Sequence, residues 1–112
     1  MSYTYNHVTL IGRLTKDPEH RQITDDRGLT YFTLAVDRPY RKEDGKHETD
    51  FVPIAFWGKL ANVTLQLLSK GKPVLVWGQL HLQRFEKDKD THYRTEISGE
   101  GFQLLDKLPP KD

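Results

Sequence analysis

The chain contains no cysteine among its 112 residues. Disulfide bonds, thiolate catalysis and cysteine-based zinc sites are therefore excluded, and the fold has to be held by packing and hydrogen bonds. Long apolar runs are also missing, because no segment approaches the roughly 20 residues that cross a bilayer as a helix. The first residues lack the basic stretch, apolar block and cleavage site of a signal peptide, so we expect a cytoplasmic protein.

Motifs of catalysis are absent as well. No Gly-rich phosphate loop, nucleophile motif or His-x-x-x-His spacing occurs, and the acidic pairs Asp25/Asp26 and Asp88/Asp90 fall in polar turns. The spacing allows His81 and His92 to face each other across the last hairpin, but two ligands rarely make a metal site. We therefore predict a binding protein that is not an enzyme and needs no cofactor.

Excess charge of one sign is small, since the formal net charge is only +1. This balance differs from that of a histone-like protein and counts mildly against nucleic-acid binding. The distribution of charge matters more than the sum. Cations and an aromatic ring are mixed in residues 38–42 (RPYRK), and again in residues 83–87 (QRFEK).

Short segments that alternate apolar and polar residues predict strands. The candidate strands are residues 7–14, 19–23, 29–36, 50–57, 74–85 and 92–97, and the one candidate helix is residues 59–69. Gly12 predicts a bulge or sharp bend in the first strand, and Pro53 predicts a bulge or an unpaired edge position. The polar residues 37–49 predict a long hairpin loop.

Several curled strands with one interposed helix are typical of a small closed barrel. We predict an all-β fold, a five-stranded OB-fold barrel with one helix between strands 3 and 4. Residues 1–106 are expected to form this single domain, and residues 107–112 a disordered C-terminal end.

The segment 51–57 is apolar on both faces of a strand. Val52, Ile54 and Phe56 share one face, whereas the opposite face carries Phe51 and Trp57, two rings about 20 Å apart along the strand. An open face of this kind suits base stacking, and the alternative is burial beneath the helix or a partner subunit.

Two further rings stand beside cations. Tyr40 lies in a polar segment with Arg38, Arg41 and Lys42, and Phe85 follows Arg84 near a hairpin tip. Rings that stack on bases and cations that hold phosphates are what a groove for a single strand requires. The alternative for each ring alone is a solvated hairpin with the ring lying over its own strands.

The chain resembles the bacterial-type single-stranded-DNA-binding protein family. The resemblance spans about residues 6–105 and is carried by segments in the family's order. These segments are NHVTLIGRL (6–14), DPE (17–19), TLAV (33–36), TDFVPIAFWGKLA (49–61), LSKGKPVLVWGQL (68–80) and YRTE (93–96).

The resemblance implies sequence-tolerant binding of single-stranded DNA in replication, recombination and repair, in the bacterial cytoplasm with the nucleoid. It places the stacking rings at Tyr40, Phe51, Trp57 and Phe85, and nearby cations at Lys59, Lys70 and Arg84. It also implies a homotetramer.

The chain departs from the family pattern at three places. Pro53 replaces a position that is often basic, and Trp77 stands where an acid is common, so its ring has a core, interface or stacking role. The chain stops without the family's acidic, hydrophobic tip. Replication and repair proteins are expected partners only if such a tail is missing here.

Two other functions remain open at this stage. One is an OB-fold module of the primosomal type, used in replication restart to bind proteins, which predicts poor affinity for single strands. The other is an RNA-binding OB domain, since stacking does not distinguish the two sugars unless the 2′-hydroxyl is recognised.

Overall fold

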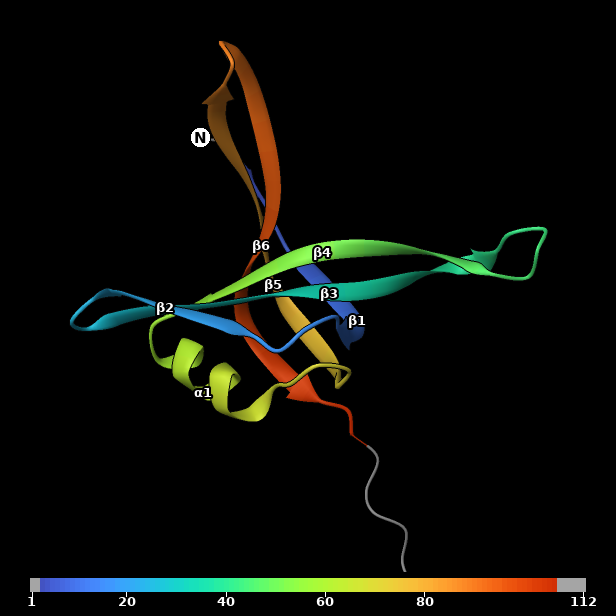
Figure 1. Cartoon of the computed structure of the whole chain (residues 1–112), viewed down its shortest axis with the longest axis horizontal. Helices are drawn as coiled ribbons and strands as arrows, with labels where there is room; N and C mark the ends of the chain where they lie inside the picture. The colour runs from blue at the N-terminus through green and yellow to red at the C-terminus, as the bar shows by residue number, and fades with distance from the viewer. Residues whose placement is uncertain (1–2, 107–112) are drawn as a thin grey trace, which may run out of the picture.

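The computed structural model describes residues 3–106, which form six strands and one helix (Figure 1). In chain order the elements are β1 (Val8–Leu14), β2 (Glu19–Thr24), β3 (Arg27–Arg41), β4 (His47–Trp57), α1 (Lys59–Leu67), β5 (Pro73–Lys87) and β6 (Asp90–Leu104). The expected disordered end, residues 107–112, lies outside the described residues.

Five of the strands close into a ring. The sheet order is β1-β5-β6-β4-β3-β2, and an additional pairing of β1 with β3 closes the ring and leaves β2 on the outer edge of β3. Helix α1 connects β4 to β5, which are the third and fourth strands of the ring in chain order. The predicted five-stranded OB-fold barrel with one helix between strands 3 and 4 is therefore confirmed, with β2 as an addition.

Gly12 lies where β1 changes partner. Residues before it pair with β5, whereas Arg13 and Leu14 pair with Ala35 and Leu34 of β3. A Cβ atom at position 12 would collide with the carbonyl oxygen of Ala35. Only glycine allows the two backbones to come this close, so the predicted bend is confirmed and the barrel closes there.

The interior of the ring is filled by alternate residues of β3, β4 and β5. Leu34, Ile54, Phe56 and Val76 are among the completely buried side chains. The Phe56 ring lies 6.2 Å from the Phe32 ring and 5.8 Å from the Phe102 ring, measured between centroids. These residues form one continuous core, which fixes the opposite face of β3 and β4 to the outside.

Helix α1 packs against the end of this core. Thr30 of β3 is buried and its hydroxyl donates a 2.6 Å hydrogen bond to the carbonyl oxygen of Ala61. The helix ends two residues before the predicted end at residue 69, because Leu68 is extended with φ −102° and ψ 146°. Within residues 3–106 no helix has the length and apolar character that crossing a bilayer requires.

The hairpin loop predicted for residues 37–49 is wrong, because most of this segment is strand. β3 continues to Arg41 and β4 begins at His47, and only the residues between them turn. The ladder has a bulge between Asp37 and Arg41. A two-stranded ribbon that is exposed on both faces needs no apolar alternation, so its sequence looks like a loop.

The bulge proposed at Pro53 is also wrong. Pro53 pairs with Thr33 inside an unbroken register that runs from Leu29↔Trp57 to Asp37↔Thr49. On its other side β4 pairs with β6 only at Ile54 and Ala55. Pro53 therefore stands beside an edge without ladder partners, which agrees with the second alternative.

Two phenylalanines of β4 provide a matched test of this inside–outside assignment. Phe56→Ala should lower the free energy of unfolding by about 3–5 kcal/mol, because it leaves a cavity among Phe32 and Phe102. Phe51→Ala, on the same strand but 65% exposed, should change it by less than about 0.5 kcal/mol. Urea unfolding measures both, and equal losses would contradict the assignment.

Candidate nucleic-acid interface

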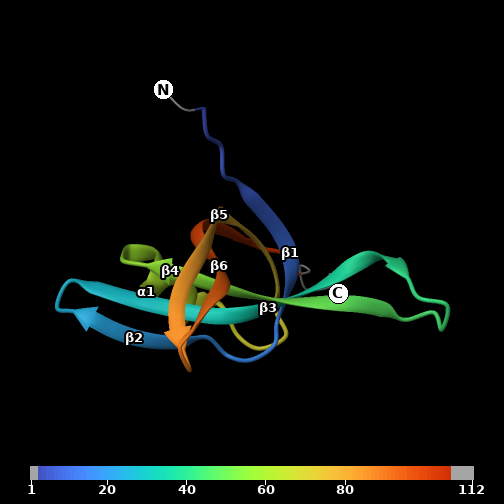
Figure 2. The ribbon, with the colours of Figure 1, turned by 90° about the horizontal axis from the view of Figure 1, so that it is seen from above.

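Two strand pairs extend beyond the barrel as arms, which we call the β3–β4 arm (residues 36–52) and the β5–β6 arm (residues 79–95). They project in different directions (Figures 1 and 2). All residues of the β5–β6 arm are exposed. The radius of gyration is 16.4 Å, whereas a compact chain of this length has about 13 Å. The arms therefore offer surface that serves no core of this chain.

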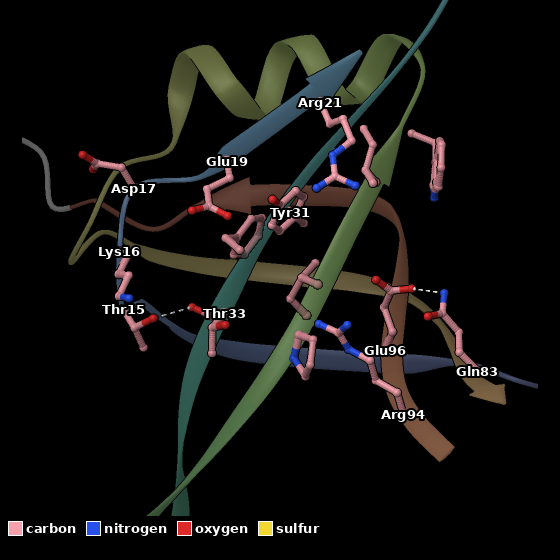
Figure 3. Close-up of a pocket in the computed structure, with 15 residues that line it drawn as sticks. Thr15, Lys16, Asp17, Glu19, Arg21, Tyr31, Thr33, Gln83, Arg94 and Glu96 are labelled. Carbon is pink, nitrogen blue, oxygen red and sulfur yellow. Dashed lines mark hydrogen bonds between the residues drawn. The ribbon is translucent and has the colours of Figure 1, made fainter. Parts of the chain in front are cut away.

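A hollow of about 550 Å³ lies on the outer face of the barrel, between β3, β4 and the base of the β5–β6 arm (Figure 3). Its lining includes Tyr31 and Thr33 from β3, Pro53 and Trp57 from β4, and Arg94 from β6. These residues come from segments far apart in the chain. The register of β3 with β4 brings the first four onto one face.

The hollow contains equal numbers of cationic and acidic side chains: Lys16, Arg21 and Arg94 against Asp17, Glu19 and Glu96. The acids already have partners in the protein. Asp17 accepts a 2.8 Å hydrogen bond from the backbone N–H of Lys70, and Glu96 accepts one of 3.0 Å from Gln83.

The third acid of the hollow, Glu19, accepts a hydrogen bond from the Tyr31 hydroxyl. This bond, followed by partial burial, raises the pKa of Tyr31. Within residues 3–106, Arg21 and Arg94 make no ion pair with a carboxylate. They extend over β3 and β4 from opposite sides (Figure 3). Their guanidinium groups are therefore available to an anionic ligand.

Trp57 forms one end of the hollow. It is 37% exposed, and the guanidinium carbon of Arg27 lies 4.5 Å from its ring centroid. Gly58, with φ 69°, follows it and donates a 3.0 Å hydrogen bond to the Gly28 carbonyl oxygen. The positive φ turns the chain from β4 directly into α1 and leaves the indole at the rim.

Phe51 lies on the same face of β4 as Trp57 but outside the hollow, toward the β3–β4 arm. It pairs with Ala35, whose small side chain leaves the Phe51 ring uncovered. The outward orientation expected for both rings is thus what the structure has, and the alternative of burial beneath α1 does not hold for either.

Phe85 projects from the β5–β6 arm. Its ring stacks on His92, its cross-strand partner, with centroids 5.5 Å apart, and it is 45% exposed. Side chains alternate along a strand, so Arg84 lies on the opposite face of the arm from Phe85. The cation that reaches the hollow from this arm is Arg94, which the sequence analysis did not select.

The β3–β4 arm carries a second, smaller hollow of about 160 Å³. It is lined by Arg38, Tyr40, Arg41, Lys42 and Glu48, so the structure brings together the four arm residues selected from sequence. Tyr40 is 73% exposed. Alternation places Glu48 on the face of the arm opposite Phe51, so the arm presents two separate binding faces.

Arg38 is held by two carboxylates of β4. Its Nη1 donates to Glu48 over 2.8 Å, and its Nε and Nη2 donate to the two oxygens of Asp50 over 3.2 and 3.1 Å. Lys42 lies 3.5 Å from Glu48. The hydrogen bond from Arg38 lowers the pKa of Asp50, and the same bond raises the pKa of Arg38.

Lys59 and Lys70 stand away from both hollows. Lys59 is the first residue of α1, directly after the Trp57–Gly58 corner, and Lys70 lies beyond the other end of the helix. Both side chains are exposed. The structure therefore places one of these two lysines near the exposed Trp57 ring and the other beside the β1–β2 connection.

Four residues at the main hollow escaped the sequence analysis: Arg21, Arg27, Tyr31 and Arg94. Tyr31 had a usable signal, because alternation placed it opposite the buried Phe32. Arg21 and Arg94 had none, since the pairing of β2 with β3 and the curl of β6 decide where they point.

The two histidines expected to face each other do not. His81 pairs with Glu96, whereas His92 pairs with Phe85. Among the described residues no group of three or more His, Cys, Asp or Glu side chains is placed to hold a metal ion.

Comparison with known proteins gives a consistent result. A sequence model of the "Single-strand binding protein family" matches residues 5–105. "Single-stranded DNA-binding protein 2" of Streptococcus agalactiae serotype III (strain NEM316) is 40% identical over 102 residues, which cover 91% of this chain and 78% of that protein. "Single-stranded DNA-binding protein 3" of Clostridium acetobutylicum is 47% identical over 104 residues, covering 90% of this chain and 71% of that protein.

The ion pairs of Arg38 make a testable statement about Asp50. Its carboxyl group should titrate below the usual range of aspartate, and Arg38→Gln should raise this midpoint, because the main hydrogen-bond donor is lost. Carboxyl-carbon NMR against pH measures both. Arg41→Gln removes a cation of the same arm and is the control. A midpoint in the usual range that Arg38→Gln leaves unchanged would contradict the ion pairs.

The sign of the linked effect on stability follows from the lowered pKa. The Arg38–Asp50 pair stabilises the fold above the unfolded-state pKa of Asp50, and this contribution is lost as the pH falls through the lower folded-state pKa. Both groups are exposed, so the loss should be small.

Proposed function

The chain belongs to the single-strand binding protein family, and we propose that it binds single-stranded DNA by stacking bases on exposed rings and holding phosphates with arginine and lysine. The prediction of a binding protein rather than an enzyme agrees with this membership. Protection of unpaired strands in replication, recombination and repair is the role that the family typically has.

The observation that carries the proposal is the main hollow. It combines an exposed indole with two guanidinium groups that no carboxylate of the described chain neutralises. Every base has a π-face, so stacking there tolerates any sequence, and the guanidinium groups supply contacts to the phosphates.

From the main hollow the strand has two continuations. One follows β4 from Trp57 to Phe51 and on to the arm hollow with Tyr40, Arg41 and Lys42. The other follows the β5–β6 arm to Phe85. Lys59, Lys70 and Arg84 add positive charge around these paths without lining either hollow. The extended arms let one domain contact a long stretch of strand.

We also propose that the chain assembles as a homotetramer. Ile11 is 57% exposed and Trp77 half-buried, and both lie on strands β1 and β5, whose outer face points away from the hollow. The edge of β1 over residues 8–11 has no strand partner among the described residues. An apolar face beside an open strand edge supports association between copies. Light scattering measures the copy number.

Replacement of one tryptophan tests the stacking site. Trp57→Ala should weaken binding of oligo-dT about 5-fold to 150-fold, since a stacked base contributes about 1–3 kcal/mol. The Trp77→Phe variant is the control and should bind as the unmodified protein does. In that variant Trp57 is the only indole left, so DNA should still quench the fluorescence. Unchanged affinity of Trp57→Ala would contradict the stacking role.

A comparison of two arginines tests which face of the β5–β6 arm meets the strand. Arg94→Ala should reduce the slope of log K against log salt by about 0.7, the value for one phosphate contact of a single strand. Arg84→Ala, on the opposite face, should change the slope less. A larger effect of Arg84→Ala would show that the strand follows the other face. An equal series with oligo-U measures preference for DNA over RNA.

A further inference from the structure

The charged groups of the β3–β4 arm are arranged differently from those of the main hollow. In the hollow the carboxylates have partners and the guanidinium groups are free, whereas on the arm the cations themselves are engaged. Three N–H groups of Arg38 donate to Glu48 and Asp50, out of the five that a guanidinium offers. Lys42 is paired to the remaining oxygen of Glu48.

Strand geometry explains this arrangement. Glu48 and Asp50 are two residues apart on β4 and therefore share a face. The bulge between Asp37 and Arg41 lets Arg38 lean toward both carboxylates, and Nδ1 of His47 donates a 2.8 Å hydrogen bond to the Arg38 carbonyl oxygen. The pairing is thus fixed by backbone as well as by charge.

We propose that Glu48 and Asp50 act as an internal substitute for DNA phosphates, which the strand must displace before Arg38 and Lys42 can bind it. This inference rests on the proposed function and adds a residue role to it. We call the two acids the carboxylate clamp. A carboxylate and a phosphate present similar oxygen pairs to a guanidinium, so they compete for the same donors.

The clamp lowers the affinity of the arm relative to the main hollow. A phosphate that binds Arg38 gains one contact but frees two carboxylates, which then have to be rehydrated. All four side chains are about half exposed, so each pair is weak and exchange is easy. The main hollow therefore engages a strand first, and the arm joins when the strand is long enough to reach it.

Neutralising the clamp tests this inference. Glu48→Gln with Asp50→Asn should tighten binding of oligo-dT about threefold to tenfold at low salt. The dependence of log K on log salt should become steeper by about 0.7 for each cation released, so the two proteins should converge in affinity at high salt. Thermal unfolding followed by circular dichroism checks that the variant is folded.

The matched control changes net charge equally without touching the clamp. Glu43→Gln with Glu86→Gln removes one acid from the turn of the same arm and one from the other arm, and neither is paired with a cation within the described chain. Its gain should stay below about twofold, because exposed charges beyond about 10 Å are screened at 0.1 M salt. An equal gain in the control would overturn the clamp.

Two further outcomes distinguish displacement of the clamp from an orienting role of the two acids. In a protein that carries Arg38→Ala and Lys42→Ala, neutralising Glu48 and Asp50 should have no additional effect. A loss of affinity on neutralisation would show that the acids only orient Arg38, and would overturn the inference. Unmodified protein that binds DNA without any gain in the variant refutes the clamp alone. Absence of binding in both refutes the proposed function.

Discussion

The unbroken antiparallel register of β3 with β4 determines both the core and the candidate interface. Because side chains alternate along each strand, this one register sends Phe32, Leu34, Ile54 and Phe56 inward. The residues between them, with Tyr31 and Trp57 among them, form the outer surface. A slip by one residue would exchange the two sets, so burial of the core is also what keeps the rings open to a ligand.

Electrostatic pairing then decides which cations are available. The net charge of +1 gives little attraction for an anionic strand, and the main hollow contains as many acids as bases. Its acids, however, are occupied by a backbone N–H, a tyrosine hydroxyl and an amide, whereas Arg21 and Arg94 are free to bind. The arm has the reverse arrangement around Arg38. Local pairing rather than net charge therefore ranks the binding surfaces.

The sequence predicted the barrel, the helix position and the two faces of β4, because each of these follows from alternation and spacing. It also predicted outward rings at Phe51 and Trp57. It did not predict that residues 37–49 are mostly paired strand, since an exposed ribbon has no apolar pattern. Contacts such as Arg27 over Trp57, or Arg38 with Glu48 and Asp50, depend on strand pairing and a bulge that composition does not encode.

The central claim is that single strands lie on the outer face of β3 and β4. The most direct measurement is photo-cross-linking of an oligonucleotide that carries 5-iododeoxyuridine, with the attachment sites mapped by mass spectrometry. The account predicts attachment to Trp57, with further sites among Phe51, Tyr40 and Phe85. Attachment confined to Trp77 and the outer face of β1 and β5, with these four rings unmodified, would contradict it.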